Sequence, residues 1–104
     1  MSLKIDAGFS EKEGLWVVRP EGEIDISNAH ILKERLAAAF GERQAGIRID
    51  MGGTTYLDST GLGAIIGAYG RLKEKGCILS LANPRDNVKK LLNVTNLDRV
   101  LMEE

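Results

Sequence analysis

The run Asp58-Ser59-Thr60-Gly61-Leu62-Gly63 holds the residues of this chain that are best suited to chemistry. Ser59 stands where an extended segment is predicted to end and a helix to begin. A serine at such a junction can cap the helix, because its hydroxyl accepts a hydrogen bond from a free N–H of the first turn. The same hydroxyl is a nucleophile that a kinase can reach, at a helix end that favours negative charge. We therefore predict that Ser59 caps this helix, and we ask whether it is also a switch.

The residues around this serine each have more than one interpretation. Gly61 and Gly63 fall in the predicted first helical turn, where each glycine costs about 0.8 to 1 kcal/mol relative to alanine. They permit either close packing of the helix on a sheet or the close approach of another protein's backbone or a nucleotide. Leu62 is either a core residue or partly exposed for docking. Asp58 is either a solvated carboxylate or a contact residue, and Thr60 is a weaker second phosphoacceptor.

The sequence gives little support for catalysis by the chain itself. A serine hydrolase needs a base near its nucleophile, but His30 is the only histidine, and Ser59 lacks the G-x-S-x-G elbow. No G-x-x-x-x-G-K-[ST] phosphate loop occurs, and the glycines from Gly61 onward do not form G-x-G-x-x-G. The single Cys77 lacks the partners of a disulfide or a metal site. We predict no enzymatic activity, no catalytic residue, no metal and no cofactor.

Hydrophobic periodicity predicts the elements that must position Ser59. An initial strand pair, followed by strands that alternate with helices, indicates an α/β layer fold with right-handed crossovers. We expect one small domain over residues 1–104, with a mixed sheet of four to five strands and packed helices. The predicted strands are 3–7, 15–19, 47–51 and 78–82, with a short last strand at 100–102. The predicted helices run from about 27 to 40, from 59 to 75 and from 84 onward.

Three local signals refine these boundaries. Pro20 is expected to interrupt the second strand, since proline lacks the N–H that a strand ladder uses. Either Ser27 or Asp25 is expected to cap the first helix, because both residue types are favoured there. Asn83 and Pro84 match the preferences for the cap and first position of the third helix.

Two segments together resemble the STAS domain family, and within it the stand-alone bacterial anti-sigma factor antagonists. The run Asp58–Gly63, preceded by the strand Ile47–Met51 and by Tyr56–Leu57, resembles the family signature. The segment Pro20–Asp25 resembles the family's G-x-[IL]-D stretch after the second strand. The order of elements matches over essentially the whole chain. The D-S-x-G-L motif alone is moderately specific, and with the upstream segment and the chain length the resemblance is strong.

The resemblance implies a partner-switching regulator of transcription. In such families the unphosphorylated antagonist binds an anti-sigma factor that is also an ATP-dependent serine kinase, and the sigma factor is freed. The kinase phosphorylates the motif serine, here Ser59, the complex dissociates, and a phosphatase resets the cycle. The resemblance also implies that Asp25 lies near Ser59. The expected partner-binding residues are Asp25, Asp58, Thr60, Gly61, Leu62 and Gly63.

Composition limits the alternatives. A chain of 104 residues with 43% hydrophobic residues can form one small domain with its own core. A pI near 5.9 argues against a dedicated nucleic-acid binder. No signal peptide or membrane-length apolar run is visible, so we expect a cytoplasmic location without membrane insertion. The alternative function is a STAS-fold assembly subunit of a lipid-transport or other transporter complex, without a phosphorylation cycle.

Overall fold

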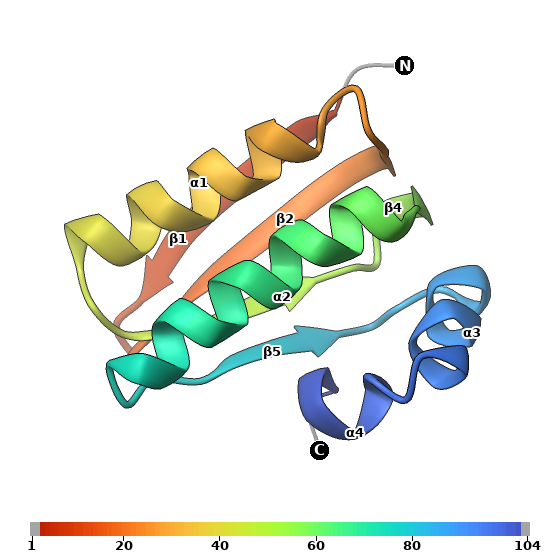
Figure 1. Cartoon of the computed structure of the whole chain (residues 1–104). Helices are drawn as coiled ribbons and strands as arrows, with labels where there is room; N and C mark the ends of the chain where they lie inside the picture. Colours follow the sequence, from red (N-terminus) through yellow and green to blue (C-terminus); the bar gives the residue numbers. More distant parts are fainter. Residues whose placement is uncertain (1–2, 103–104) are drawn as a thin grey trace.

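The computed structural model describes residues 3–102, and these form a mixed five-stranded sheet and four helices (Figure 1). The strands are β1 (Lys4–Ser10), β2 (Leu15–Ile24), β3 (Gly46–Asp50), β4 (Thr54–Leu57) and β5 (Leu79–Ala82). The helices are α1 (Ala29–Glu42), α2 (Ser59–Glu74), α3 (Asp86–Val94) and α4 (Asp98–Leu101). β4 was not predicted as a separate strand.

The strands follow the order β1-β2-β3-β5, while β4 pairs with the last residues of β2. β1 and β2 are antiparallel, as the short turn between them predicts, and the other pairings are parallel. Figure 1 shows α1 and α2 side by side over one face of the sheet, with α3 and α4 following β5. The predicted α/β fold with a mixed sheet is therefore confirmed.

The hydrophobic core lies between the sheet and the helices α1 and α2. Alternate residues of each strand point toward these helices, which is why the period-2 pattern of the sequence is a reliable guide here. Burying a Leu or Ile side chain contributes about 1.5 to 3 kcal/mol, so this layer dominates the stability of the fold. Its fully buried members include Val18, Ile24, Leu32, Ile49, Ile65, Leu79 and Leu81.

β2 continues to Ile24, so the prediction that Pro20 interrupts it is wrong. β2 pairs with β3 over Leu15–Val18 and with β4 over Gly22–Ile24. Pro20 pairs with Ile5 of β1 and lies between the β3 and β4 pairings, where neither β3 nor β4 pairs with it and a missing N–H is tolerated. The hydroxyl of Thr54 donates to the Pro20 carbonyl over 3.1 Å. Because β2 pairs first with β3 and then with β4, the ends of β2 and β4 lie side by side at one edge of the sheet.

The first helix begins later than predicted. Its N-cap is Asn28 rather than Ser27 or Asp25, and α1 starts at Ala29. The carboxylate of Asp25 instead accepts hydrogen bonds from the N–H and the hydroxyl of Ser27. These bonds hold the turn before the helix, and the Asp25 carboxylate does not cap it; only the Asp25 carbonyl accepts from the Ala29 N–H, over 2.8 Å.

The C-terminal elements also differ from the prediction. α3 begins at Asp86 after the N-cap Arg85, because Asn83 adopts a φ of 55° and turns the chain before the helix. The predicted last strand is mostly helical, since α4 extends to Leu101. Met102 alone forms a parallel bridge, to Leu81 of β5.

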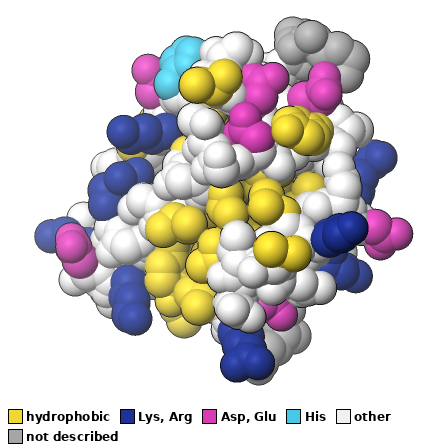
Figure 2. Space-filling view, turned by 45° about the vertical axis from the view of Figure 1, so that its right-hand side comes forward, with side chains coloured by type: hydrophobic (Ala, Val, Ile, Leu, Met, Phe, Trp, Pro, Cys, Tyr) yellow, Lys and Arg dark blue, Asp and Glu magenta, His cyan; other side chains and the backbone are white. Residues whose placement is uncertain are grey.

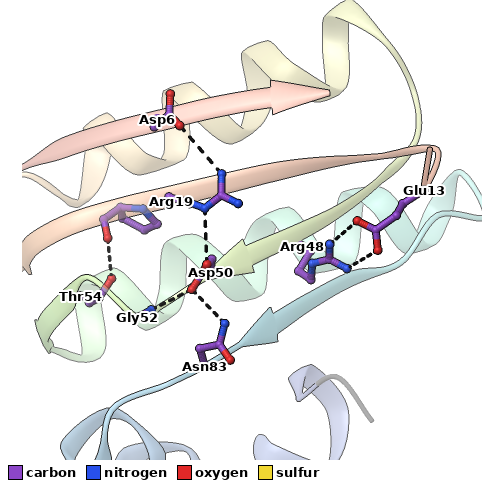
Figure 3. A network of polar contacts seen from close by, with 9 residues as sticks. Asp6, Glu13, Arg19, Arg48, Asp50, Gly52, Thr54 and Asn83 are labelled. Atoms are coloured by element: carbon purple, nitrogen blue, oxygen red, sulfur yellow. Dashed lines mark hydrogen bonds and ion pairs between the residues drawn. The ribbon is translucent and has the colours of Figure 1, made fainter. Parts of the chain in front are cut away.

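The sheet face opposite α1 and α2 carries a network of polar side chains (Figure 3). Arg19 of β2 lies between two carboxylates, with its Nη1 3.9 Å from Asp6 Oδ2 and its Nε 3.4 Å from Asp50 Oδ2. Asp50 Oδ1 also accepts hydrogen bonds from the Gly52 N–H over 3.0 Å and from Asn83 Nδ2 over 3.3 Å. Asp50 thus connects β2, the β3–β4 turn and the segment after β5.

We expect the contribution of Asp50 to stability to depend on pH. The pKa of Asp50 lies below its ordinary value, chiefly because the Gly52 N–H donates to the carboxylate, with Asn83 and Arg19 contributing. A lowered pKa in the folded state means that the stabilisation is present above the unfolded-state pKa and is lost as pH falls through the folded value. Asp50→Asn should therefore lower the free energy of unfolding at neutral pH. The difference in free energy of unfolding between this variant and wild type should close as the pH falls below about 4.

Urea unfolding at neutral and acid pH measures this gap. Glu34→Gln, which removes an exposed carboxylate on α1, is the matched control. A gap for Asp50→Asn that stays constant with pH would contradict the assignment.

Candidate functional site at the start of helix α2

Two acidic residues emerge side by side from neighbouring strands. Ile24 of β2 lies opposite Leu57 of β4 in the parallel register, so Asp25 and Asp58 follow at the same edge of the sheet. The N–H of Asp58 donates to the carbonyl of Ile24 over 3.2 Å, which links the two strand ends directly. The structure therefore places Asp25 beside the junction of Asp58 and Ser59.

Asp58, and not Ser59, caps helix α2. Its Oδ1 accepts hydrogen bonds from the N–H groups of Thr60 over 2.9 Å and Gly61 over 3.0 Å. The backbone of Asp58 is extended, as an N-cap requires, whereas Ser59 is the first helical residue. The prediction that the Ser59 hydroxyl forms the cap is wrong. A carboxylate in this position also interacts favourably with the positive end of the helix dipole.

The Ser59 side chain is exposed and uncommitted. Within residues 3–102 its hydroxyl has no hydrogen-bond partner. Thr60 and Gly63 are exposed as well, and Asp58 is half-buried. An enzyme could therefore reach the Ser59 hydroxyl without displacing an existing interaction of this chain.

Gly61 and Leu62 lie beneath this surface. A Cβ atom at Gly61 would stand 2.6 Å from Leu57 Cδ1 and 2.7 Å from Ile24 Cγ2. Gly61 thus allows the first turn of α2 to pack directly on the ends of β2 and β4, which is one of the two interpretations of this glycine. Leu62 is only 4% exposed and belongs to the core. Gly63 differs, since a Cβ there would meet no atom within 4 Å.

The loop that carries Asp25 is held by Asn28, a residue that the sequence analysis did not single out. Asn28 is buried; its Oδ1 accepts from the Asp25 N–H over 2.9 Å, and its Nδ2 donates to the Glu23 carbonyl over 2.8 Å. Hydrogen bonds from Ser27 lower the pKa of Asp25 below its ordinary value, and the bond from the Ser27 hydroxyl has the largest effect. Asp25 is therefore ionised at neutral pH. A polar residue just before a helix was the available signal for Asn28.

The surface around these strand ends combines acidic and hydrophobic side chains. Figure 2 shows several Asp and Glu side chains near the top of the face in view, above a broad hydrophobic area. Within residues 3–102 no group of three or more His, Cys, Asp and Glu side chains is placed to hold a metal ion. In the same part of the chain, no helix has the length and apolar character needed to cross a membrane.

We expect Asp58→Ala to destabilise the start of α2 by about 1 kcal/mol, because two N–H groups lose their acceptor. Ser59→Ala should change the free energy of unfolding much less, since its hydroxyl bonds to no described residue. Chemical denaturation of both variants measures this difference. Equal losses for the two variants would contradict the assignment of the cap to Asp58.

This small α/β domain, with an exposed serine after a capping aspartate, belongs to a known class of regulatory domain. The chain is a member of the STAS domain family, whose model matches residues 8–103. It is 31% identical over 99 residues to the anti-sigma-B factor antagonist of Bacillus subtilis strain 168. The aligned region covers 95% of this chain and 90% of that protein.

Solved structures share the fold. An anti-sigma factor antagonist from Mycobacterium paratuberculosis superposes with a TM-score of 0.83 at 23% identity, covering 96% of this chain and 83% of that one. The anti-sigma factor antagonist SpoIIAA in its unphosphorylated form gives 0.79 at 19% identity, covering 99% and 88%. The phosphorylated form of SpoIIAA from Bacillus gives 0.72 at 19% identity, covering 99% and 91%.

Proposed function

We propose that this chain is an anti-sigma factor antagonist that is switched by phosphorylation of Ser59. Unphosphorylated, it binds an anti-sigma factor with serine kinase activity, which then releases its sigma factor. The kinase transfers the γ-phosphoryl group of ATP to Ser59 Oγ, which loses its proton, ADP leaves, and the complex dissociates. A phosphatase hydrolyses the phosphate ester with water, which releases inorganic phosphate and restores the hydroxyl. The observation that carries this proposal is the exposed, unbonded hydroxyl of Ser59 at the first position of α2.

The proposed switch follows from the charge around Ser59. A phosphate group adds about 1.5 to 2 negative charges at neutral pH. Asp58 already occupies the N–H groups of Thr60 and Gly61, so the phosphate adds its charge beside a bound carboxylate and close to Asp25. In solution, water and the helix dipole stabilise this charge. In a complex the same charge must lose its water, which weakens binding while the fold persists.

We assign the partner contacts according to exposure. Ser59, Thr60 and Gly63 present exposed surface, and the half-buried Asp25 and Asp58 flank them. Gly61 and Leu62 contribute from beneath, by setting the position of the first helical turn.

In this scheme the kinase and the phosphatase supply all the chemistry, and the chain itself is not an enzyme. It acts in the cytoplasm, where sigma factors meet RNA polymerase, and it contacts neither DNA nor a membrane. The named function of the Bacillus subtilis relative favours this regulatory function over the transporter-subunit alternative.

The proposal is tested by incubating the purified chain with ATP and the serine kinase anti-sigma factors of its source organism, each purified separately. We expect one of them to form a complex that ATP dissociates, with one phosphate mapped to Ser59 by mass spectrometry. A pull-down from lysate of the same organism is run in parallel. Capture of a membrane transporter subunit, with no phosphorylation by any of these kinases, would contradict the proposal and support the alternative.

A further inference from the structure

A groove runs between helices α1 and α2, beside the start of α2 but separate from the Ser59 hydroxyl. Its volume is about 380 Å³, which is enough for a few side chains but not for a folded element. Ile26, His30 and Lys33 line it from the α1 side, and Thr60, Gly67 and Arg71 from α2. The groove reaches the Ser59 site through Thr60, the next residue along the chain.

The depth of the groove depends on glycines that the fold itself does not require. A Cβ at Gly63 would meet no atom within 4 Å, and one at Gly67 would meet only Arg71 Nη1, at 3.6 Å. Glycine inside a helix costs about 0.8 to 1 kcal/mol relative to alanine. Since alanine would fit at both positions, the fold does not require these glycines, and their missing side chains leave the groove open to a partner atom.

The charge and polarity of the rim indicate which partner chemistry fits. Lys33 and Arg71 line opposite sides, and neither has an ion-pair partner within residues 3–102. No acidic side chain lines the groove, although the whole chain has a net charge of −1. Ile26 is 79% exposed at the rim, in the loop before α1. A complementary ligand therefore has carboxylates beside an apolar side chain.

We propose that this groove receives an acidic segment of the anti-sigma factor. An apolar side chain of that segment packs over Gly63 and Gly67 against Ile26, while flanking carboxylates face Lys33 and Arg71. This inference rests on the proposed function and extends it. A phosphate on Ser59 adds negative charge at one end of the groove, so it repels the same acidic segment and contributes to release.

Two groove variants and two matched controls test the inference. Gly67→Leu fills the groove. Gly70→Leu is its control, because it adds the same side chain to α2 outside the groove, at a position where an added Cβ meets no atom within 4 Å. The pair Lys33→Glu with Arg71→Glu reverses the rim charge. The pair Lys12→Glu with Lys89→Glu changes the net charge equally, at exposed positions outside the groove.

Binding is measured by calorimetry against the purified anti-sigma factor that phosphorylates Ser59, with circular dichroism to verify folding. We expect each groove variant to weaken binding about tenfold or more, and each control by less than about threefold. Added salt should weaken wild-type binding more than that of the charge-reversed pair.

The outcomes separate the two claims. Groove variants that bind as tightly as wild type would overturn the groove assignment and leave the Ser59 switch intact. Absence of any anti-sigma factor that binds the wild-type chain would overturn the proposed function, and the groove assignment with it.

Discussion

Replacing Ser59 by alanine is expected to make the complex with the kinase partner persist in the presence of ATP. The variant lacks the only atom that accepts the phosphoryl group in the proposed cycle. Its fold should be nearly unchanged, because Asp58 provides the helix cap and the Ser59 hydroxyl bonds to no described residue. The rate of ATP-driven release should therefore fall by at least about tenfold. This corresponds to a rise of at least about 1.4 kcal/mol in the apparent activation free energy of release.

Surface-immobilised anti-sigma factor, loaded with the chain and washed with ATP, measures this release. Ser80→Ala, which removes a hydroxyl from β5 outside the groove and the Ser59 site, is the matched control and should dissociate as wild type does. If ATP released the Ser59→Ala variant as readily as wild type, the switch would lie at another residue. Ser59→Asp should bind more weakly than wild type even without ATP, because it places a negative charge where the phosphate would be.

Replacing Gly61 by alanine is expected to destabilise the fold strongly. A Cβ at this position would lie 2.6 Å from Leu57 Cδ1 and 2.7 Å from Ile24 Cγ2, so buried side chains or the helix must shift. Overpacking of this kind typically costs about 1 to 3 kcal/mol, which exceeds the gain of up to about 1 kcal/mol in helix propensity.

Gly70→Ala is the matched control on the same helix, because no atom lies within 4 Å of its added Cβ. It should stabilise the chain by up to about 1 kcal/mol. Urea unfolding of the two variants should therefore give changes of opposite sign. Similar stabilisation by both substitutions would show that the start of α2 does not pack as tightly on β2 and β4 as described.

The fold class was predictable from the sequence because strand and helix periods are local properties. Alternation along 47–51 and the helical spacing after Ser59 both reflect burial on one face of an element, and both were confirmed. The course of β2 past Pro20 was not predictable in this way. It depends on a change of partner from β3 to β4, between residues more than 30 positions apart.

The sequence predicted that a helix begins at Ser59, but not which side chain caps that helix. Asp58 and Ser59 are both good capping residues, and only the extended backbone at Asp58 decides between them. The groove between α1 and α2 combines residues such as Lys33 and Arg71, which only the packing of the two helices brings together. Ile26 gave a weak signal, as an apolar residue isolated between two polar ones.

The separation of the cap, Asp58, from the proposed phosphoacceptor, Ser59, has a consequence for how such domains diversify. Because Asp58 holds the helix alone, position 59 is free to vary without loss of the scaffold. A gene copy could exchange serine for threonine and so respond to a different kinase, or carry glutamate and remain permanently detached. Sets of these domains with graded thresholds for release could then arise by single substitutions at one site.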